Sequence, residues 1–184
     1  MLNKVWEFLK NPINRQDPNT DVTYRKHVFI QLLKLNIVFS LAAGVFAALL
    51  VFGLEIDLGQ HAAQKAFEDF PLHKLLFLVV ILAPIIEEFI FRAPLALFKN
   101  PRYFKYAYYI SFLLFGFVHI FNFERIPPVW IIPFLVLPQL FSGIFLGFIR
   151  VKLALKWSIM LHAAHNFILV LPPLLISLPK MIHP

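Results

Sequence analysis

The stretch VFIQLLKLNIVFSLAAGVFAALLVFG, residues 28–53, decides the fold class of this chain. It is apolar throughout except for a few side chains, including Lys34 and Asn36 near its start. A helix of about 20 mostly apolar residues is long enough to cross the hydrocarbon core of a bilayer. We therefore predict that residues 28–53 span the membrane, with Lys34 and Asn36 reaching back to the interface.

Four further apolar stretches follow the first, at residues 72–98, 104–123, 129–149 and 153–171. Hydrophobic residues make up 60% of the chain and charged residues only 15%, whereas soluble domains average about half and about a quarter. We predict an all-α fold, a polytopic transmembrane helix bundle with about five membrane-spanning helices, and treat residues 28–184 as one transmembrane domain. Gly143 and Gly147 form a Gly-x-x-x-Gly pair, which favours close helix packing.

The two ends of the chain carry weaker patterns. Residues 1–27 contain no long apolar run and are predicted to be a cytoplasmic or interfacial segment. The amphipathic pattern at residues 5–10 indicates a short interfacial helix on the membrane surface, with a frayed polar tail as the alternative. Residues 174–178 either extend the fifth helix past Pro172 and Pro173 or form a separate interfacial piece.

The basic residues that give the chain its net charge of +7 lie mostly in the predicted loops and the N-terminal segment. Basic residues concentrate in the segments 1–27, 99–105 and 150–156, whereas the loops 54–73 and 124–128 carry one each. Such alternation predicts a multi-pass protein of the cell (plasma) membrane with its N-terminus in the cytoplasm and its C-terminus outside. No basic face remains for nucleic acid, so membrane lipid is the expected surrounding partner. The absence of cysteine excludes disulfides and thiolate catalysis.

Deep inside the second predicted span lie three ionisable residues, Glu87, Glu88 and Arg92, whereas His73 and Lys74 lie at its start. Charged groups near the centre of a bilayer cost several kcal/mol and usually mark a site or a pathway. Glu88 and Arg92 are four residues apart, so they share a helix face and can pair. Glu87 points to another face and is available for chemistry. A buried ion pair that only fixes helix packing is the alternative interpretation.

The later spans contain His119 and the group His162, His165 and Asn166. His162 and Asn166 share a helix face, and His165 falls near it. A lone histidine is more often structural than functional, and His and Asn also hydrogen-bond between helices. At a rise of 1.5 Å per residue, Glu87, His119 and His162 lie roughly 16, 18–22 and 13 Å from the helix ends predicted to face the cytoplasm. They could therefore meet at one depth as a catalytic set.

Three motifs occur in order: Glu-Glu-x-x-x-Arg at 87–92, Phe-x-x-x-His at 115–119 and His-x-x-x-Asn at 162–166. Together they resemble the CAAX protease and bacteriocin-processing (CPBP) family of intramembrane endopeptidases. The resemblance spans about residues 74–170, the predicted protease core. His165 lies outside the motifs and is assigned to support or packing. The family often has more membrane helices than this chain offers.

The resemblance implies a role for each motif residue. Glu87 would be the general base that activates a water, and His119 would help to hold that water. His162 and Asn166 would stabilise the oxyanion of the tetrahedral intermediate. Two residues would have supporting roles, Glu88 and Arg92. The implied substrate is a membrane-associated peptide or protein.

A zinc-dependent version of the same protease is the alternative, with Glu87, His119 and His162 as ligands and one position open to water. We favour the version without a cofactor, because the chain lacks the His-Glu-x-x-His motif of many zinc proteases. Two other classes remain open: a non-catalytic peptide-binding membrane protein with an immunity or sorting role, and a proton-coupled transporter that uses Glu and His as a relay. The sequence does not specify the oligomeric state.

Overall fold

The computed structural model describes residues 1–182, with side chains as far as residue 175. This part of the chain is helical and contains no β-strand, so the predicted all-α fold is confirmed. Its segments, in order, are α1 (Leu2–Lys10), α2 (Val22–Gly53), α3 (Ala62–Asp69), α4 (Leu72–Leu76), the π-helix η1 (Phe77–Leu82), α5 (Ala83–Phe91), the 3₁₀ helix η2 (Ala93–Leu97), α6 (Pro101–Val118), the 3₁₀ helices η3 (His119–Asn122) and η4 (Val129–Ile131), α7 (Ile132–Leu135), α8 (Leu137–Lys152) and α9 (Leu155–Ile182).

Three helical stretches in the described part are long and apolar enough to cross a membrane: Val22–Gly53, Pro101–Asn122 and Leu155–Leu175. A fourth forms if Val129–Leu135 and Leu137–Lys152, which are bent by 48°, make one span. The polytopic bundle is therefore confirmed, with three or four candidate spans in place of about five.

The stretch at residues 72–98 is apolar but divided, and it is not among these candidate spans. The π-helix η1 precedes Pro84, and η2 begins one residue before Pro94. Proline removes a backbone donor and clashes with the preceding turn, which disturbs the regular α-helical hydrogen bonds beside Pro84 and Pro94. The sequence predicted one continuous helix here because the apolar composition of the stretch does not indicate where its backbone hydrogen-bond pattern changes.

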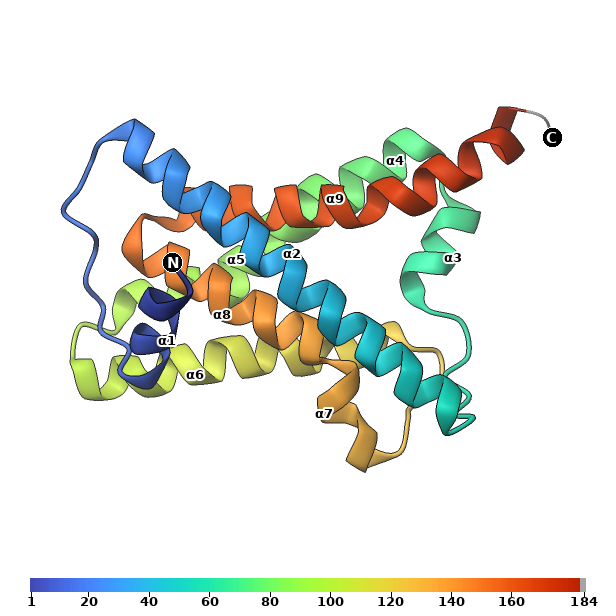
Figure 1. Ribbon diagram of the computed structural model, residues 1–184, viewed down its shortest axis with the longest axis horizontal. Coiled ribbons are helices and arrows are strands. Elements are labelled where there is room, and N and C mark those ends of the chain that lie inside the picture. The colour runs from blue at the N-terminus through green and yellow to red at the C-terminus, as the bar shows by residue number, and fades with distance from the viewer. Residues whose placement is uncertain (183–184) are drawn as a thin grey trace.

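Both ends of the chain are helical. The short N-terminal helix is present as α1, which buries Val5 and Phe8 and packs against α8. At the other end, α9 continues through Pro172 and Pro173 to Ile182, so the tail extends the fifth predicted helix. In Figure 1, α1 lies at one end of the bundle and the last turns of α9 at the other.

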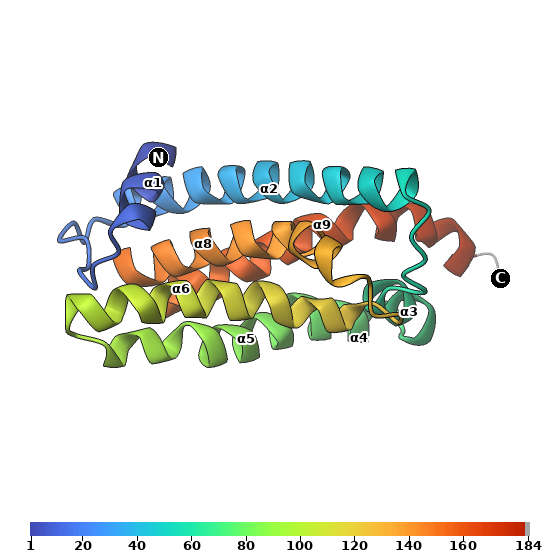
Figure 2. The same cartoon turned by 90° about the horizontal axis from the view of Figure 1, so that it is seen from below.

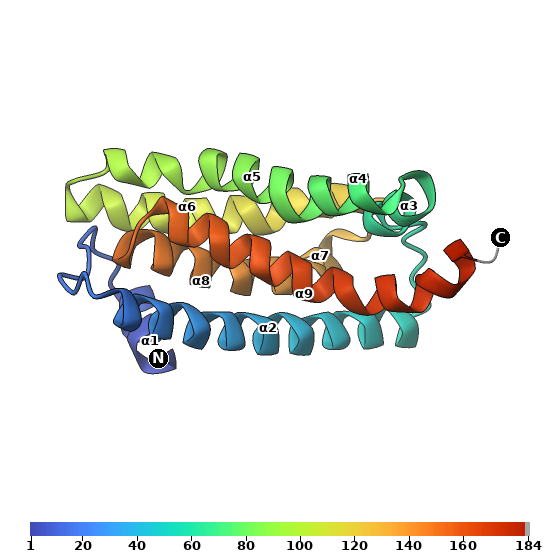
Figure 3. The ribbon, with the colours of Figure 1, turned by 90° about the horizontal axis from the view of Figure 1, so that it is seen from above.

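The helices form three layers, and α8 lies in the middle one. Figures 2 and 3 show α2 on one side, α8 and α9 in the middle, and α6 with the α4–α5 segment on the other side. Helix α8 contacts α2, α6 and α9. A Cβ on Gly143 would lie 2.9 Å from Phe112 Cβ, and one on Gly147 would lie 2.6 Å from Tyr108 Cε2. The predicted use of this glycine pair in close helix packing is therefore confirmed, between α8 and α6.

Polar side chains join α2 to α8 inside the bundle. Ser142 Oγ donates a hydrogen bond of 2.8 Å to Asn36 Oδ1, and Ser40 Oγ lies 3.3 Å from the same atom. Asn36 is fully buried. The prediction that Asn36 reaches the membrane interface is therefore wrong, because its side chain points into the bundle, where hydroxyls of two helices donate to its oxygen.

Candidate active site

A cavity of about 760 Å³ lies between α2, α5, α6, α8 and α9, and η1 and the start of α3 also line it. Its lining contains the four residues that the sequence indicates for chemistry: Glu87, His119, His162 and Asn166. They come from three helical segments distant in sequence, so only the folded bundle brings them together. His165 lines the same cavity.

Glu87 faces two imidazole rings. Its Oε2 atom lies 3.7 Å from Nε2 of His162 and 4.0 Å from Nε2 of His119. The Glu87 side chain is 27% exposed, yet Oε2 itself is buried and has no hydrogen-bond partner among the described residues. A buried carboxylate oxygen without a donor is costly. The arrangement therefore favours a small polar group between Glu87 and the two histidines.

A backbone carbonyl sets the orientation of His119. Nδ1 of His119 lies 2.6 Å from the carbonyl oxygen of Phe115, one helical turn earlier. A carbonyl only accepts hydrogen bonds, so Nδ1 carries the proton and donates it. Nε2 is consequently the nitrogen with a lone pair when the ring is neutral, and it is the atom that faces Glu87.

A second carboxylate orients His162 in the same way. Nδ1 of His162 lies 3.0 Å from Oε1 of Glu88, which leaves Nε2 directed toward Glu87. The ionised carboxylate accepts, so Nδ1 donates. When both rings are neutral, the Nε2 lone pairs of His119 and His162 and the carboxylate of Glu87 thus point toward one another. These three hydrogen-bond acceptors cannot bond to one another without a donor between them. A water molecule or an additional proton on one imidazole supplies that donor.

Glu88 belongs to a buried polar cluster. It is fully buried, and its Oε1 lies 3.4 Å from Nη1 of Arg92, which is also fully buried. The predicted pairing of Glu88 with Arg92 is therefore confirmed. The Arg92 guanidinium also lies over the Phe115 ring, 3.8 Å from its centroid. This cluster holds Glu88 away from the cavity and ties it to His162.

Ser158 is a member of this cluster that sequence reasoning missed. Its hydroxyl donates to Oε2 of Glu88 and also lies 2.9 Å from the carbonyl of Leu146. Ser158 lies one turn before His162 on α9, so both side chains reach Glu88 from one helix face. The spacing of four residues was a signal for it, but serine is common in membrane helices and did not stand out.

Asn166 makes the kind of hydrogen bond between helices that was the alternative interpretation, with a partner that the sequence did not predict. Its Nδ2 donates a hydrogen bond of 2.9 Å to the carbonyl of Val79 in the π-helix η1. A π-turn disturbs the regular ladder of backbone bonds and is often found at functional sites. Asn166 thus ties α9 to η1, and its amide has a second N–H that this contact does not use.

His165 and Gln139 add polar atoms to the cavity lining. Nε2 of His165 and Oε1 of Gln139 are buried and have no hydrogen-bond partner within the described part of the chain. His165 is 6% exposed. His165 was expected to have a supporting or packing role, and its place in the cavity lining puts it beside the motif residues.

The segment before α3 borders the cavity. His61 lines it, accepts a hydrogen bond of 3.1 Å from the N–H of Ala63, and packs its ring edgewise on Phe123. An ion pair between Asp57 and Arg125 ties the same two loops together. Burial, followed by the nearby His119, lowers the pKa of His61. His61 is therefore a neutral ring at the border of the cavity at neutral pH.

A zinc ion requires ligands at set spacings. Tetrahedral zinc with bonds of 2.0–2.1 Å holds its ligand atoms about 3.4 Å apart, whereas Glu87 Oε2 lies 3.7 and 4.0 Å from the two Nε2 atoms. Among the described residues, no group of three His, Cys, Asp or Glu side chains has the geometry of a metal site. As placed, Glu87, His119 and His162 do not fit a zinc ion.

Apolar helices around a cavity lined by ionisable residues define a multi-pass membrane protein with a buried polar site. Residues 70–168 match the family described as type II CAAX prenyl endopeptidase Rce1-like. The match covers more than half of the chain and includes all three motifs, so the chain belongs to this family. Comparisons with curated proteins and with solved structures give no match.

Family membership confirms the resemblance that the three motifs indicated. It also supports an enzyme of the CAAX protease type, embedded in the membrane and acting on a peptide substrate. The family match includes Glu87, His119, His162 and Asn166 but does not assign a role to any of them.

Proposed function

We propose that this protein is an intramembrane endopeptidase in which Glu87 activates a water for attack on a peptide bond of a membrane-associated peptide or protein. The observation that carries this proposal is the unpaired carboxylate oxygen of Glu87, which lies within 4.0 Å of both Nε2 atoms. A carboxylate oxygen that no donor among the described residues occupies is free to accept a proton from a bound water. Hydrolysis needs such a base next to a bound water.

The first step uses Glu87 and His119. A water between them donates two hydrogen bonds, one to Nε2 of His119 and the other to Oε2 of Glu87. Glu87 removes its proton while the water oxygen bonds to the carbonyl carbon of the substrate. The electron pair of the C=O bond moves to oxygen and produces a tetrahedral oxyanion.

The second step uses His162 and Asn166. His162 enters the reaction already protonated and keeps this proton throughout: it donates from Nδ1 to Glu88 and from Nε2 to the oxyanion, and the buried carboxylate of Glu88 stabilises the positive ring. The N–H of Asn166 that does not bond Val79 is the second donor. Donors held in place in a dry site stabilise an oxyanion strongly. The intermediate then breaks its C–N bond, and Glu87 returns its proton to the leaving amine.

The proposed orientation follows from the positive charges of the loops. The N-terminus and the loops after α5 and α8 lie in the cytoplasm, and the protein resides in the plasma membrane. The reaction as written uses no cofactor.

The function is tested by product analysis with the full chain in lipid nanodiscs. The probe is a prenylated CAAX-type peptide incubated in ¹⁸O-labelled water. We expect two product peptides, with one labelled oxygen in the new C-terminal carboxylate. The variants His119→Ala and His162→Ala should lose at least 100-fold in rate, while His27→Ala, an exposed histidine outside the cavity, retains it. Binding without cleavage by the wild-type protein would instead support a non-catalytic peptide binder.

A further inference from the structure

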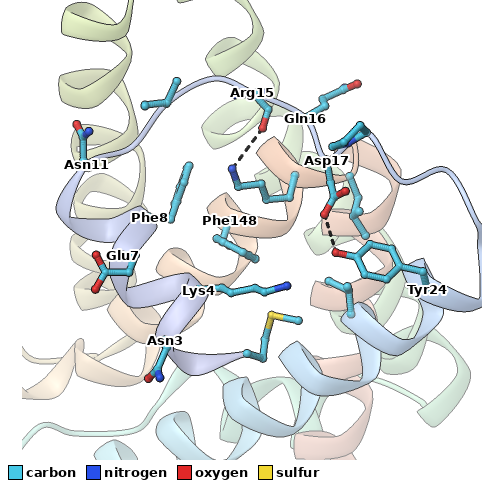
Figure 4. A pocket seen from close by; sticks show the side chains of 16 residues that line it. Asn3, Lys4, Glu7, Phe8, Asn11, Arg15, Gln16, Asp17, Tyr24 and Phe148 are labelled. Atoms are coloured by element: carbon cyan, nitrogen blue, oxygen red, sulfur yellow. Dashed lines mark hydrogen bonds between the residues drawn. The ribbon is translucent and has the colours of Figure 1, made fainter.

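A second cavity, of about 720 Å³, lies at the end of the bundle that carries α1 (Figure 4). It is bounded by α1, the connection from residue 11 to residue 21, the first turns of α2 and the last turn of α8. It shares no lining residue with the cavity around Glu87. The proposed peptidase mechanism makes no use of it.

Three basic side chains line this cavity: Lys4, Arg15 and Lys152. Lys152 Nζ donates to the carbonyl of Arg15 over 3.4 Å and lies 4.9 Å from the centroid of the Phe8 ring. The ammonium of Lys4 and the guanidinium of Arg15 make no hydrogen bond or ion pair with the described residues. Two cationic groups at the cavity are therefore available to a ligand.

The cavity has fewer negative charges than positive ones. Glu7, which also lines it, is neutralised by Lys10 at 2.6 Å. Asp17 accepts a hydrogen bond of 2.6 Å from the hydroxyl of Tyr24 and one of 2.9 Å from the N–H of Asn19. The hydrogen bond from Tyr24 is the main cause that lowers the pKa of Asp17, so Asp17 is ionised. Three cations thus face one unneutralised carboxylate, which favours an anionic ligand.

The other half of the cavity is apolar. Figure 4 shows the rings of Phe8 and Phe148 between the polar side chains, and both rings are buried. Val28 and Leu153 extend this apolar lining. These side chains give the cavity an apolar floor beside its charged groups, which an amphiphile matches better than an inorganic anion does.

The position of the cavity also favours a lipid. Helix α2 begins there and α8 ends there, each in a stretch rich in basic residues. Trp6 on the neighbouring α1 is 57% exposed. Tryptophan and basic residues concentrate where membrane helices meet the lipid headgroups. Basic pockets between helix ends at this level bind anionic headgroups.

We propose that this cavity binds an anionic phospholipid, with its phosphate at Lys4, Arg15 and Lys152 and its first acyl carbons against Phe8 and Phe148. Bound lipid would join α1 to α2 and α8. It is a separate site from the peptidase cavity, and the proposal does not depend on the proposed peptidase function.

Binding is measured by native mass spectrometry and by thermal melting of the full chain in detergent. The probes are phosphatidylglycerol, phosphatidylcholine with the same acyl chains, and inorganic phosphate. We expect phosphatidylglycerol to be retained and to raise the melting temperature, and the other two probes to do neither. Equal effects of the two lipids would overturn the proposal. An equal effect of inorganic phosphate would overturn the lipid assignment in favour of a free anion.

Variants locate the site. Lys4→Gln and Arg15→Gln remove side chains that make no hydrogen bond or ion pair with the described residues, and each should weaken phosphatidylglycerol binding about fivefold. Lys26→Gln, at an exposed lysine of the same end that does not line the cavity, should bind as the wild type does. The same affinity in all three variants would contradict this location. Glu87→Gln should also bind lipid normally, which separates this site from the peptidase.

Discussion

Nδ1 of His162 lies 3.0 Å from Oε1 of Glu88, and both side chains are buried. This contact gives the two adjacent glutamates of α5 different environments. Glu88 is enclosed by His162, Arg92 and Ser158, whereas Oε2 of Glu87 has no partner among the described residues. The hydrogen bond that one ring nitrogen of a histidine makes sets which nitrogen carries the proton and how the ring is oriented.

Removal of the Ser158 hydroxyl should slow catalysis without unfolding the protein. Ser158→Ala takes one donor from Glu88, which then holds His162 less firmly. We expect kcat to fall about tenfold, within the range for partners that orient catalytic groups, with KM nearly unchanged. Steady-state kinetics in nanodiscs measures both values. Ser111→Ala is the matched control because Ser111 bonds the Phe91 carbonyl; an equal fall of kcat in both variants would contradict the role of Ser158.

Loss of the Arg92 charge should destabilise the fold. Arg92→Met retains an unbranched apolar side chain but leaves the buried Glu88 without its cation. Breaking a buried ion pair in this way costs about 3–5 kcal/mol. Thermal melting in detergent should show a clear decrease, whereas Arg102→Met, at an exposed arginine, should melt as the wild type does. An unchanged melting temperature for Arg92→Met would show that the pair is dispensable for folding.

The close approach of α8 to α6 predicts a second stability effect. Gly143→Ala places a Cβ 2.9 Å from Phe112 Cβ and 3.2 Å from its Cα. Overpacking of this kind costs about 1–3 kcal/mol. The control is Gly53→Ala, because a Cβ there meets no atom within 4 Å. Comparable melting temperatures for the two variants would be incompatible with the described helix packing.

Chelation should not affect the peptidase reaction as proposed. Glu87 and the two histidines hold a water, so prolonged dialysis against EDTA should leave the cleavage rate within about twofold of the starting value. Cleavage is measured before dialysis, after it, and after addition of zinc. Loss of activity on dialysis with recovery on zinc would replace the proposed mechanism by the zinc-dependent alternative.

The helical fold and the meeting of the motif residues follow from local rules. Residues 28–53 are apolar over more than the thickness of a bilayer, and they form most of α2. Spacings of four residues place Glu88 with Arg92 and His162 with Asn166 on common helix faces. Comparable depths in the bundle account for the meeting of Glu87, His119 and His162. These features depend on periodicity and length, which the sequence displays directly.

Other features depend on tertiary contacts that no local pattern reports. The hydrogen bond from Asn166 to Val79 uses a carbonyl of a π-turn, whose position depends on packing. Asn36 is buried because Ser142 of a distant helix reaches it. Ser158 gains its role only because Glu88 lies opposite. The second cavity exists because α1 folds back over α8.

The most direct test of the central claim is single-turnover cleavage by Glu87→Gln, with peptide binding measured in the same nanodiscs. The amide is nearly the same size as the carboxylate but cannot accept the proton of the attacking water. We expect normal binding and a cleavage rate at least 1,000-fold below wild type, with full activity in Glu68→Gln, whose glutamate lies outside the cavity. Cleavage by Glu87→Gln at the wild-type rate would contradict the assignment of Glu87 as the base.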